Sequence, residues 1–593
     1  MTERYGSYGV QSYRSSFDGA NRVSSVNYRV SPAWNGTFRD ARAYSYTYDS
    51  GNGSLTGMGL PANGSYTYSY DALQRLTGRT LKLNGSNFLT RSYSFVPGTG
   101  TNGTTMMVAS MSTVKGNGSS LNSYNYSYDD VGNITAISGS TSASYSYDVL
   151  GQMLTETYGG KTYSYDYDEA GNIRSVSDGT TTHSYSYGDA QWKDLLTAYD
   201  GHAITYDAIG NPTSWHDGTT FTWDLGRRLM SAENTASGLD NSYTYDSDGL
   251  RLTKTVGAVQ HKYVWQGGKL VSENWAGQEL EFFYDESGSP YAFSYKSSAT
   301  ATPVMYYYVT NLQGDVVNIL DASGNIKASY TYNAWGEILS ATGDMAAVNP
   351  LRYRGYYFDT DTGLYYLQSR YYDPEICRFI NADGYASTGQ GILGTNMFAY
   401  CKNDPANYTD SAGDRGFKSV LAKALIKNLI LDSIIHRKVQ LQVSQDNPGV
   451  TYKNPMIIYN NGGRYKGGYG FCDLYNTETG EVWEVKKNTV DGESARKQLE
   501  RYTKGRLNAN LGLTLKVGTS PLILNSFETE VFGTVYQVNC YPDPDVQGLI
   551  RYNYSRSAKN DIKARQAFSS PAAETSFNGF PFLPFPGFPG FVF

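Results

Sequence analysis

The stretch PLRYRGYYFDTDTGLYYLQSRYYDP, residues 350–374, and the segment NMFAYCKNDPANYTDSAG, residues 396–413, decide how this chain is organised. Both are dense in Tyr and Asp, and Asp-Thr-Gly at 361–363 and Tyr-Asp-Pro at 372–374 mark turns. The sequence before them is a Tyr- and Gly-rich repeat, and the sequence after them has a different composition and period. The chain therefore divides at about residue 414.

One phrase recurs from about residue 40: alternating Tyr, Ser and Thr, then Tyr-Asp, then a turn that contains Gly, then Leu or Ile. Alternation with period two predicts a strand with one aromatic face, and the Asp-x-x-Gly-Asn turn accepts a positive φ. Each unit is then a β-hairpin whose aromatic face is buried only by its neighbours, so the hairpins stack. Clear examples are YNYSYDDVGNI from Tyr124, YSYDYDEAGNI from Tyr163 and YTYDSDGLRL from Tyr243.

The repeated Tyr-Asp pair has two interpretations. In the first, the Asp caps the turn and the Tyr packs across neighbouring strands. In the second, the tyrosines bind surface polysaccharide, and the chain is a cell-surface adhesin. We favour the first interpretation for the pair, and we keep the carbohydrate-binding adhesin as an alternative function.

Composition also favours β-structure, because the chain has 55 Tyr and 63 Gly and only 18% charged residues. The cysteines are scattered and none forms a C-x-x-C pair, which argues against a disulfide framework and a structural zinc site; they are Cys377, Cys401, Cys472 and Cys540. No apolar run approaches about 18 residues, so we expect no membrane span. The N-terminus lacks an apolar signal-peptide centre, and we expect the chain to be the C-terminal part of a longer one rather than a protein with unconventional export.

The segment 350–413 closely resembles the core region of Rhs/YD-repeat proteins, the large bacterial polymorphic toxins. The resemblance implies that the repeats spiral into a hollow, cocoon-like β-shell, that the core plugs this shell, and that a variable toxin domain follows. It also implies secretion or cell-surface delivery, action of the toxin in the cytoplasm of a competing cell, and a cognate immunity protein.

We therefore expect a multidomain chain: an all-β shell of stacked hairpins with a core plug, followed by a small α/β domain. The expected parts are a YD-repeat shell at 1–305, the core at 306–414, a C-terminal toxin domain at 415–570 and a Phe/Pro-rich tail at 571–593. Proline at every second to fourth position of the tail excludes a helix or a central strand. The tail is then a disordered or extended segment, or a partner-binding peptide.

In related proteins the core carries two aspartates that cut the chain just after it. The matching residues here are Asp383, in RFINADGY, and Asp410, in NYTDSAGD. Two carboxylates that share one proton can act as base and acid on a water molecule. The resemblance thus implies self-cleavage near Gly413–Asp414. The alternative is that both aspartates cap turns, in which Asp is a favoured residue.

The core departs from the pattern of its relatives in four places. Cys377 replaces a glycine, Gly384 and Ser411 replace prolines, and Asp414 stands where Leu or Trp is usual. These departures bear on the cleavage and leave the boundary near residue 414 in place.

The segment after the core is basic. Residues 415–570 carry 22 Lys and Arg against 14 Asp and Glu, whereas residues 1–414 carry 27 against 40. A basic domain on an acidic body points to a polyanionic target, nucleic acid first. Residues 417–443 have apolar side chains at helical spacing and predict an amphipathic helix.

The passage GYGFCDLYNTETGEVWEVKKN, residues 468–488, predicts a hairpin around NTETG. A loop centred between residues 478 and 479 places Asp473 opposite Glu484, about 5 Å away, with Lys486 on the same face as Glu484. Opposed carboxylates repel each other unless a cation lies between them. We therefore expect Mg²⁺ or Mn²⁺ at this position.

The Asp–x10–Glu–Val–Lys arrangement resembles the PD-(D/E)xK signature of restriction-endonuclease-like nucleases. A predicted helix at 491–507 places Gln498 and Tyr502 on one face, as in RecB-type nucleases. His436 resembles the His of a His-x-x-x-Gln element that precedes the Asp in toxin nucleases of this fold. The alternatives are a solvated strand face for the acidic pair, helix packing for Gln498 and Tyr502, and a helix C-terminal position for His436.

The resemblance implies a role for each residue of this candidate nuclease site. Asp473, Glu484 and the Val485 carbonyl would hold the metal, and Lys486 would orient the attacking water or stabilise the transition state. The residues expected at phosphates are Arg496, Lys497, Arg501, Lys504 and Arg506. We predict a metal-dependent endonuclease, most simply a DNase; the alternatives are an RNase, another toxin activity, or the adhesin.

Overall fold

The computed structural model describes residues 2–5, 10–18, 22–30, 42–98, 103–384 and 392–413, and short segments beyond them. These segments are 417–418, 439, 442–443, 446–447, 450–451, 458–459, 469–470, 474–476, 481–487, 506–507, 516–517, 522, 524, 527–531, 534–542 and 549–556. The chain divides into two compact units, Met1–Ala424 and Leu425–Phe582, and each is described by itself.

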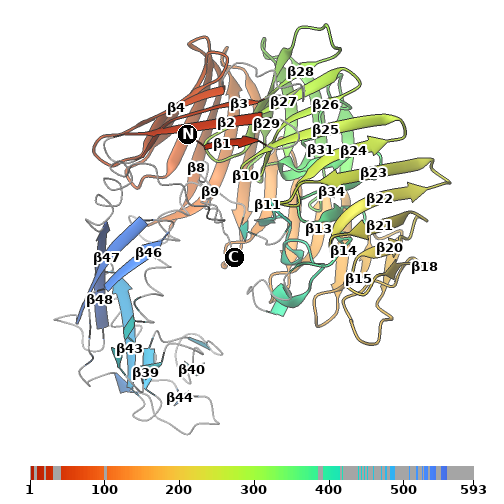
Figure 1. Ribbon diagram of the computed structural model, residues 1–593. Helices are drawn as coiled ribbons and strands as arrows, with labels where there is room; N and C mark the ends of the chain where they lie inside the picture. Colours follow the sequence, from red (N-terminus) through yellow and green to blue (C-terminus); the bar gives the residue numbers. More distant parts are fainter. Residues whose placement is uncertain are drawn as a thin grey trace, which may run out of the picture. The chain divides into compact units, whose positions relative to one another are not determined.

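The first unit contains two large antiparallel sheets in which each strand pairs with the next along the chain (Figure 1). The first sheet contains β1 (Thr2–Tyr5), β2 (Val10–Phe17), β3 (Val23–Val30), β4 (Arg42–Tyr48), β5 (Leu55–Leu60), β6 (Gly64–Tyr70), β7 (Leu76–Leu83), β8 (Ser86–Pro97), β9 (Thr104–Lys115), β10 (Ser120–Tyr128), β11 (Ile134–Gly139), β12 (Ala143–Tyr147), β13 (Met153–Tyr158), β14 (Lys161–Tyr167), β15 (Ile173–Ser177), β16 (Thr182–Ser186), β17 (Ala198–Tyr199) and β18 (His202–Ala203).

The second large sheet continues this order along the chain. It contains β19 (Thr205–Tyr206), β20 (Pro212–Ser214), β21 (Thr220–Asp224), β22 (Arg228–Asn234), β23 (Leu239–Tyr245), β24 (Arg251–Val256), β25 (Val259–Gln266), β26 (Lys269–Trp275), β27 (Gln278–Tyr284), β28 (Pro290–Lys296), β29 (Val304–Thr310), β30 (Val316–Asp321), β31 (Ile326–Tyr332) and β32 (Ile338–Thr342). The prediction of an all-β repeat made of stacked hairpins is confirmed for these residues.

Alternation explains why these segments form strands. In β4, Arg42, Tyr44 and Tyr46 are buried, whereas Ser45 and Thr47 between them are exposed. One face of the strand therefore packs inward and the other faces solvent, as the period of two in the sequence predicts.

The Asp of each repeat caps the turn that follows its strand. Asp129 accepts hydrogen bonds through Oδ1 from the backbone N–H groups of Val131 at 3.1 Å and Asn133 at 2.8 Å, and the Asn133 amide donates to Asp129 Oδ2 at 3.0 Å. Gly132 has a φ of 81°, which a side chain would disfavour. Backbone N–H groups also bind the carboxylates of Asp148, Asp168, Asp207, Asp246, Asp285 and Asp321 in the same way. The predicted turn is confirmed.

The Tyr before the Asp links neighbouring units. The hydroxyl of Tyr128 donates to the Val108 carbonyl at 2.8 Å, and that of Tyr147 donates to the Ile134 carbonyl at 2.6 Å. Tyr167 makes the same contact with the Met153 carbonyl, at 2.7 Å. The Tyr-Asp pair thus serves as a cross-strand contact and a turn cap, as the first interpretation holds.

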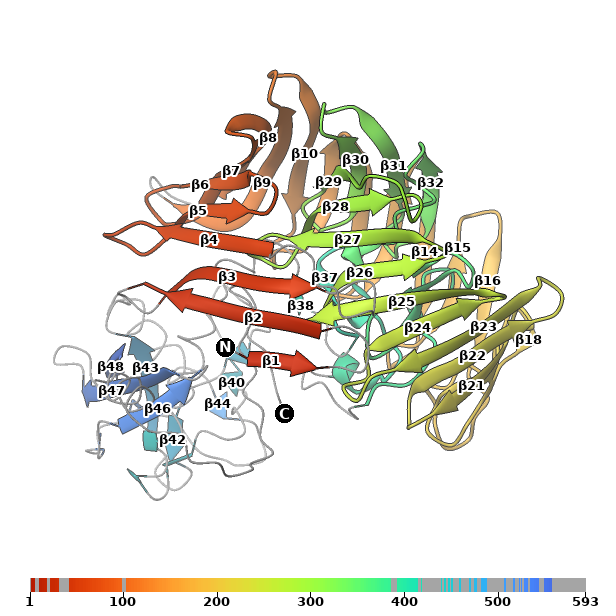
Figure 2. The same ribbon diagram turned by 45° about the horizontal axis from the view of Figure 1, so that its top comes forward.

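Strands far apart in the sequence face each other across the first unit. The start of β4 lies beside β27 (Figure 2), and Arg42 on β4 donates to the carbonyls of Phe282 at 2.7 Å and Val271 at 3.1 Å. Arg79 on β7 pairs with Asp285 at 2.6 Å. These guanidinium groups, that of Arg42 buried and that of Arg79 partly buried, join the two large sheets through charge-assisted hydrogen bonds.

The core region is packed against the second sheet. It contains η1 (Tyr353–Gly355), β33 (Tyr357–Asp359), β34 (Leu364–Tyr366), β35 (Tyr371–Asp373), β36 (Arg378–Phe379), η2 (Ile392–Thr395), η3 (Cys401–Asn403) and β37 (Tyr408–Thr409). Tyr365, Tyr372 and Tyr400 are fully buried and share one hydrophobic cluster with Tyr165 on β14 and with Trp335, which follows β31. The core therefore fills space between repeat strands, as its expected role as a plug requires.

Two predicted helices differ from the structure, the first at its start and the second at its end. Phe417–Lys418 is β38, which pairs with β37, so the helix predicted from residue 417 does not begin there. Gly413 has a φ of 75° and turns the chain back onto β37, and this pairing overrides the helical pattern. Residues 439, 442, 443 and 446 are helical. Arg506–Leu507 is β44 instead of the end of the helix predicted at 491–507, because it pairs with β40 (Ile458–Tyr459).

The second unit has a mixed sheet in the order β39–β42–β43–β48–β47–β46, with β45 beside β43, and a smaller sheet, β41–β40–β44. The bounds are β39 (Val450–Thr451), β41 (Tyr469–Gly470), β42 (Leu474–Asn476), β43 (Glu481–Lys487), β45 (Lys516–Val517), β46 (Phe527–Val531), β47 (Thr534–Pro542) and β48 (Leu549–Arg556). β43 runs parallel to β48 and β45. The described residues do not establish an α/β restriction-endonuclease-like domain. No helix among the described residues combines the length and the apolarity that crossing a membrane requires.

The turn cap can be tested with Asp168→Ala. The carboxylate of Asp168 accepts from Ala170 N–H and Asn172 N–H, both at 2.9 Å. We expect its loss to destabilise the first unit by about 1–2 kcal/mol, because two N–H groups lose their acceptor. The measurement is thermal or urea unfolding followed by circular dichroism.

Asp166→Ala is the matched control on the same hairpin. Asp166 pairs with Arg174 at 3.4 Å, and both side chains are exposed, so the free energy of unfolding should change by less than about 0.5 kcal/mol. Equal effects of the two substitutions would contradict the assigned role of the turn.

Candidate functional site

Arg370, between β34 and β35, is the centre of the candidate self-cleavage site. Its Nη2 lies 3.0 Å from Asp383 Oδ2 and 3.5 Å from Asp410 Oδ2. All three side chains are at most 5% exposed. The structure thus brings together the two aspartates that the sequence singles out, and it adds a guanidinium that sequence reasoning missed.

The same guanidinium holds the chain at the expected cleavage position. Arg370 donates from Nε to the Gly413 carbonyl and from Nη1 to the Met397 carbonyl, the latter at 3.0 Å. The Gly413 N–H donates to Asp410 Oδ1 at 2.8 Å, and the Ser369 hydroxyl donates to the Ala412 carbonyl at 2.7 Å. The Gly413 peptide groups are therefore held at both nitrogen and oxygen.

Gly413 accepts no larger residue at this position. An added Cβ would lie 2.8 Å from Ser369 Oγ and 2.9 Å from the Leu367 carbonyl oxygen, and the φ of 75° disfavours a side chain as well. The close approach of the chain to Arg370 thus depends on glycine.

This arrangement supports both interpretations of the aspartates. Asp410 caps a turn through the Gly413 N–H. It also lies, with Asp383, at a guanidinium that touches a backbone carbonyl, and such a donor stabilises the oxyanion that forms when water attacks the carbonyl. The geometry can therefore supply an acid, a base and an oxyanion donor at one peptide bond.

Two cysteines of the core, Cys377 and Cys401, are buried. Burial raises the pKa of the Cys401 thiol well above its usual value, and the charge of Asp410 raises it further. Burial likewise raises the pKa of Cys377. Since the thiolate is the reactive form, burial disfavours the reactive state of both thiols. Cys377 has a φ of 60°, a backbone conformation that favours glycine.

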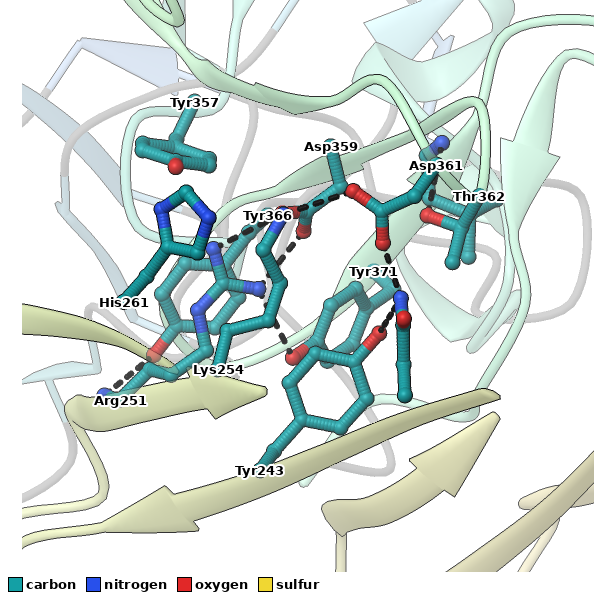
Figure 3. Close-up of polar contacts among 12 residues, drawn as sticks. Tyr243, Arg251, Lys254, His261, Tyr357, Asp359, Asp361, Thr362, Tyr366 and Tyr371 are labelled. Carbon is teal, nitrogen blue, oxygen red and sulfur yellow. Dashed lines mark hydrogen bonds and ion pairs between the residues drawn. The ribbon is translucent and has the colours of Figure 1, made fainter. Parts of the chain in front are cut away.

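A second buried cluster fixes the core to the repeats (Figure 3). Arg251 on β24 binds Asp359 through two hydrogen bonds, Nη1 to Oδ2 at 2.6 Å and Nη2 to Oδ1 at 3.1 Å. Lys254, also on β24, lies 2.7 Å from both Asp359 and Asp361. Burial by itself raises the pKa of Asp359. The positive charges of Arg251 and Lys254 lower it by more, so the pKa lies below its ordinary value. The sequence did not predict this cluster, because the segment Asp-Thr-Asp-Thr-Gly at 359–363 has the composition of a turn.

Aromatic rings surround the buried guanidinium of Arg251. Its Cζ lies 4.5 Å from the centroid of Tyr366 and 4.9 Å from the centroids of Tyr263 and Tyr357. Cation–π contacts of this kind compensate in part for the loss of water around a charge. The cluster positions β33 and β34, and the chain reaches Arg370 four residues after β34.

For the candidate nuclease site, the structure describes only backbone positions on β42 and β43. Glu484, Val485 and Lys486 lie on β43, and the hairpin register pairs Leu474 with Trp483 and Tyr475 with Val482. This is the register predicted from the sequence. The other candidates lie outside the described residues; they are His436, Asp473, Arg496, Lys497, Gln498, Arg501, Tyr502 and Lys504.

β43 is an interior strand of its sheet, between β42 on one side and β45 and β48 on the other. In the parallel pairing with β48, Glu484 is opposite Leu549 and Lys486 is opposite Arg551. Arg551 is thus a basic residue that the sequence analysis did not connect with this site. Within the part of the chain that is described, no three His, Cys, Asp or Glu side chains are grouped to hold a metal ion.

Comparisons with known proteins identify the repeats. Residues 274–405 match the Teneurin YD-shell family model, and residues 128–163 match the RHS Repeat model. The expected YD/RHS repeat is therefore confirmed for these two segments.

Two curated relatives are toxins or nucleases by name. The tRNA3(Ser)-specific nuclease WapA of Bacillus spizizenii is 36% identical over 225 residues, which is 37% of this chain and 9% of that protein. The double-stranded DNA deaminase toxin A of Burkholderia cenocepacia is 27% identical over 328 residues, 49% of this chain and 22% of that protein. This chain thus spans less than a quarter of the length of either relative. A crystal structure of TcdB2–TccC3–Cdc42 matches with 19% identity and a TM-score of 0.49, over 70% of this chain and 24% of that one.

The link between core and repeats can be tested with Asp359→Asn. Because this change leaves Arg251 and Lys254 buried without their shared carboxylate, we expect a destabilisation of about 3–5 kcal/mol. The measurement is urea-induced unfolding of the full chain.

Asp361→Asn is the matched comparison, because Asp361 is less buried and its loss leaves the Lys254–Asp359 pair in place. We expect its cost to be at most half that of Asp359→Asn. If Asp359→Asn unfolded with the same free energy as the wild type, the buried ion pairs would not be what holds the core in place.

Proposed function

We propose that this chain is the carrier of a polymorphic toxin that cuts itself after its core and delivers a nuclease. The YD/RHS repeats and core form the carrier, and residues 415–570 form the toxin domain. The names of the relatives support a toxin, since one is a tRNA nuclease and another is a DNA deaminase toxin. The proposal includes delivery from the producing cell, action in the cytoplasm of the target cell, and an immunity protein that protects the producer.

The observation that carries the self-cleavage is the meeting of Asp383, Asp410 and the Gly413 carbonyl at Arg370. One carboxylate takes a proton from a water molecule, which adds to the Gly413 carbonyl carbon while Arg370 stabilises the oxyanion. The other carboxyl group protonates the departing nitrogen as the C–N bond breaks. The products are a carboxylate on Gly413 and an amine on Asp414.

The nuclease proposal depends on β43 and its hairpin register. By alternation, Glu484 and Lys486 would share one face of β43, and the register of the described pairs, if it continued by one residue, would set Asp473 opposite Glu484. Two carboxylates and the Val485 carbonyl are oxygen donors of the kind that suits Mg²⁺ or Mn²⁺. Such an ion, when bound, would activate a water molecule and neutralise phosphate charge. Lys486 would hold the attacked phosphate or the water.

The remaining candidates have supporting roles. Gln498, Tyr502 and His436 would position the substrate backbone, and the basic residues 496, 497, 501 and 504 would bind phosphates outside the centre. We propose DNA as the substrate. RNA is the second candidate, because the relatives named WapA are tRNA nucleases.

Self-cleavage can be tested by purifying the full chain and following it by mass spectrometry. We expect two fragments that separate near Gly413–Asp414, and we expect Asp383→Asn and Asp410→Asn each to leave the chain intact. Asp344→Asn, at an exposed carboxylate that pairs with Lys327, should cleave like the wild type. An intact wild-type chain, or unchanged cleavage in both aspartate variants, would rule out the proposed role of this site.

The nuclease can be tested by incubating the full chain with plasmid DNA or total RNA and Mg²⁺. We expect degradation that EDTA abolishes, and a loss of at least about 100-fold in Glu484→Ala and in Lys486→Ala. Glu481→Ala is the control, because Glu481 is an acid on the same strand whose side chain alternates to the opposite face.

The outcomes of the nuclease assay separate the candidates. Degradation of RNA alone would assign an RNase. Activity that survives EDTA or Glu484→Ala would reject the metal site, whatever the result of the cleavage assay.

A further inference from the structure

A cavity of about 680 Å³ lies within the first unit, between repeat strands and the core. Its lining comes from β14, β16 and β21 of the repeats and from core segments around Thr362 and Pro374. The volume lies in the range of small-molecule binding sites, about 300–1,000 Å³. The proposed self-cleavage and nuclease sites do not use this cavity, since none of their residues lines it.

The charged side chains that line the cavity are predominantly acidic. The lining includes six carboxylates and neither Lys nor Arg; the carboxylates are Asp178, Asp217, Glu337, Asp361, Asp373 and Glu375. Lysines outside the lining pair with two of them, Lys161 with Asp178 at 3.3 Å and Lys254 with Asp361 at 2.7 Å. Among the described residues, the other four form no ion pair with Lys or Arg.

The surroundings of Asp373 are unfavourable for its negative charge. Asp373 is 6% exposed, and its carboxylate accepts from the Trp215 indole N–H at 3.0 Å and from the Glu375 N–H at 2.9 Å. Burial raises the pKa of Asp373 to about 6, and burial followed by the charge of Asp373 raises the pKa of Glu375. A positive charge that entered the cavity would relieve this repulsion and desolvation.

Aromatic rings form much of the remaining wall. Tyr163, Tyr165, Tyr199, Trp215, Phe221 and Phe358 line the cavity together with His183 and His216. Rings attract organic cations through their faces, and they also pack against methylene groups. Carboxylates and rings together select a ligand with both ammonium groups and an aliphatic chain.

We propose that this cavity binds an aliphatic polyamine, a small molecule with two or more ammonium groups joined by methylene chains. A single metal ion fits less well, because no three metal-ligating side chains of the described residues are grouped at one point. A neutral sugar would leave Asp217, Glu337, Asp373 and Glu375 without a counter-charge. The length of a polyamine lets separate carboxylates each meet an ammonium group.

The test is isothermal titration of spermidine into the nucleic-acid-free full chain at pH 7.5. We expect saturable binding with one site per chain, and at least a tenfold weaker affinity in the double variant Glu337→Gln, Glu375→Gln. Both side chains face the cavity and are otherwise accessible, so the amides should be tolerated. Asp344→Asn, an exposed carboxylate remote from the lining, should bind spermidine like the wild type.

A second titration needs no variant. Triethylene glycol, a neutral chain, should not bind, and 5 mM Mg²⁺ should not displace spermidine. Absence of saturable spermidine binding, equal affinity in the double variant, or full displacement by Mg²⁺ would each overturn the proposal. The last result would show that the cavity attracts cations only by its general charge.

Discussion

The buried pairing of Asp359 with Arg251 and Lys254 is the interaction on which the rest of the first unit depends. It joins a core strand to a repeat strand more than a hundred residues away, with side chains that are almost completely buried. Buried ion pairs contribute little net stability over apolar packing, but an incomplete one is costly. The ion pairs are complete only when the core lies in one position against β24. This position also fixes the segment that contains Arg370.

The repeats provide a rigid frame by simple local means. Asp residues such as Asp168 cap their own turns, and several of the preceding tyrosines, such as Tyr167, donate to a carbonyl of an earlier strand. The aromatic faces of the repeats from β13 onward share one buried cluster with the tyrosines of the core. A frame built this way holds Asp383, Asp410 and the Gly413 carbonyl at one guanidinium although they lie in separate segments. It also lines a cavity that carries an excess of acidic side chains.

Local patterns made much of this predictable from the sequence. Period-two alternation gave the strands, Asp-x-x-Gly gave the turns, and loop symmetry gave the register of the 474–483 hairpin. Contacts between distant segments were not predictable: Arg370 carries no motif, and Asp359 reads as part of a turn. The strands β1 to β3 lack the Tyr-Asp phrase and precede the recognised repeat. The helix predicted from residue 417 failed at its start because pairing with β37 outweighs local propensity.

The central claim is that core and repeats form one cooperative structure. Native-state hydrogen exchange measures it directly, because the free energy of opening is obtained for each amide. The account predicts that amides in the β34–β35 pairing, such as those of Tyr366 and Tyr371, open with the same free energy as the amides of β24. Core amides that exchange by a separate opening of much lower free energy, while β24 stays protected, would contradict it.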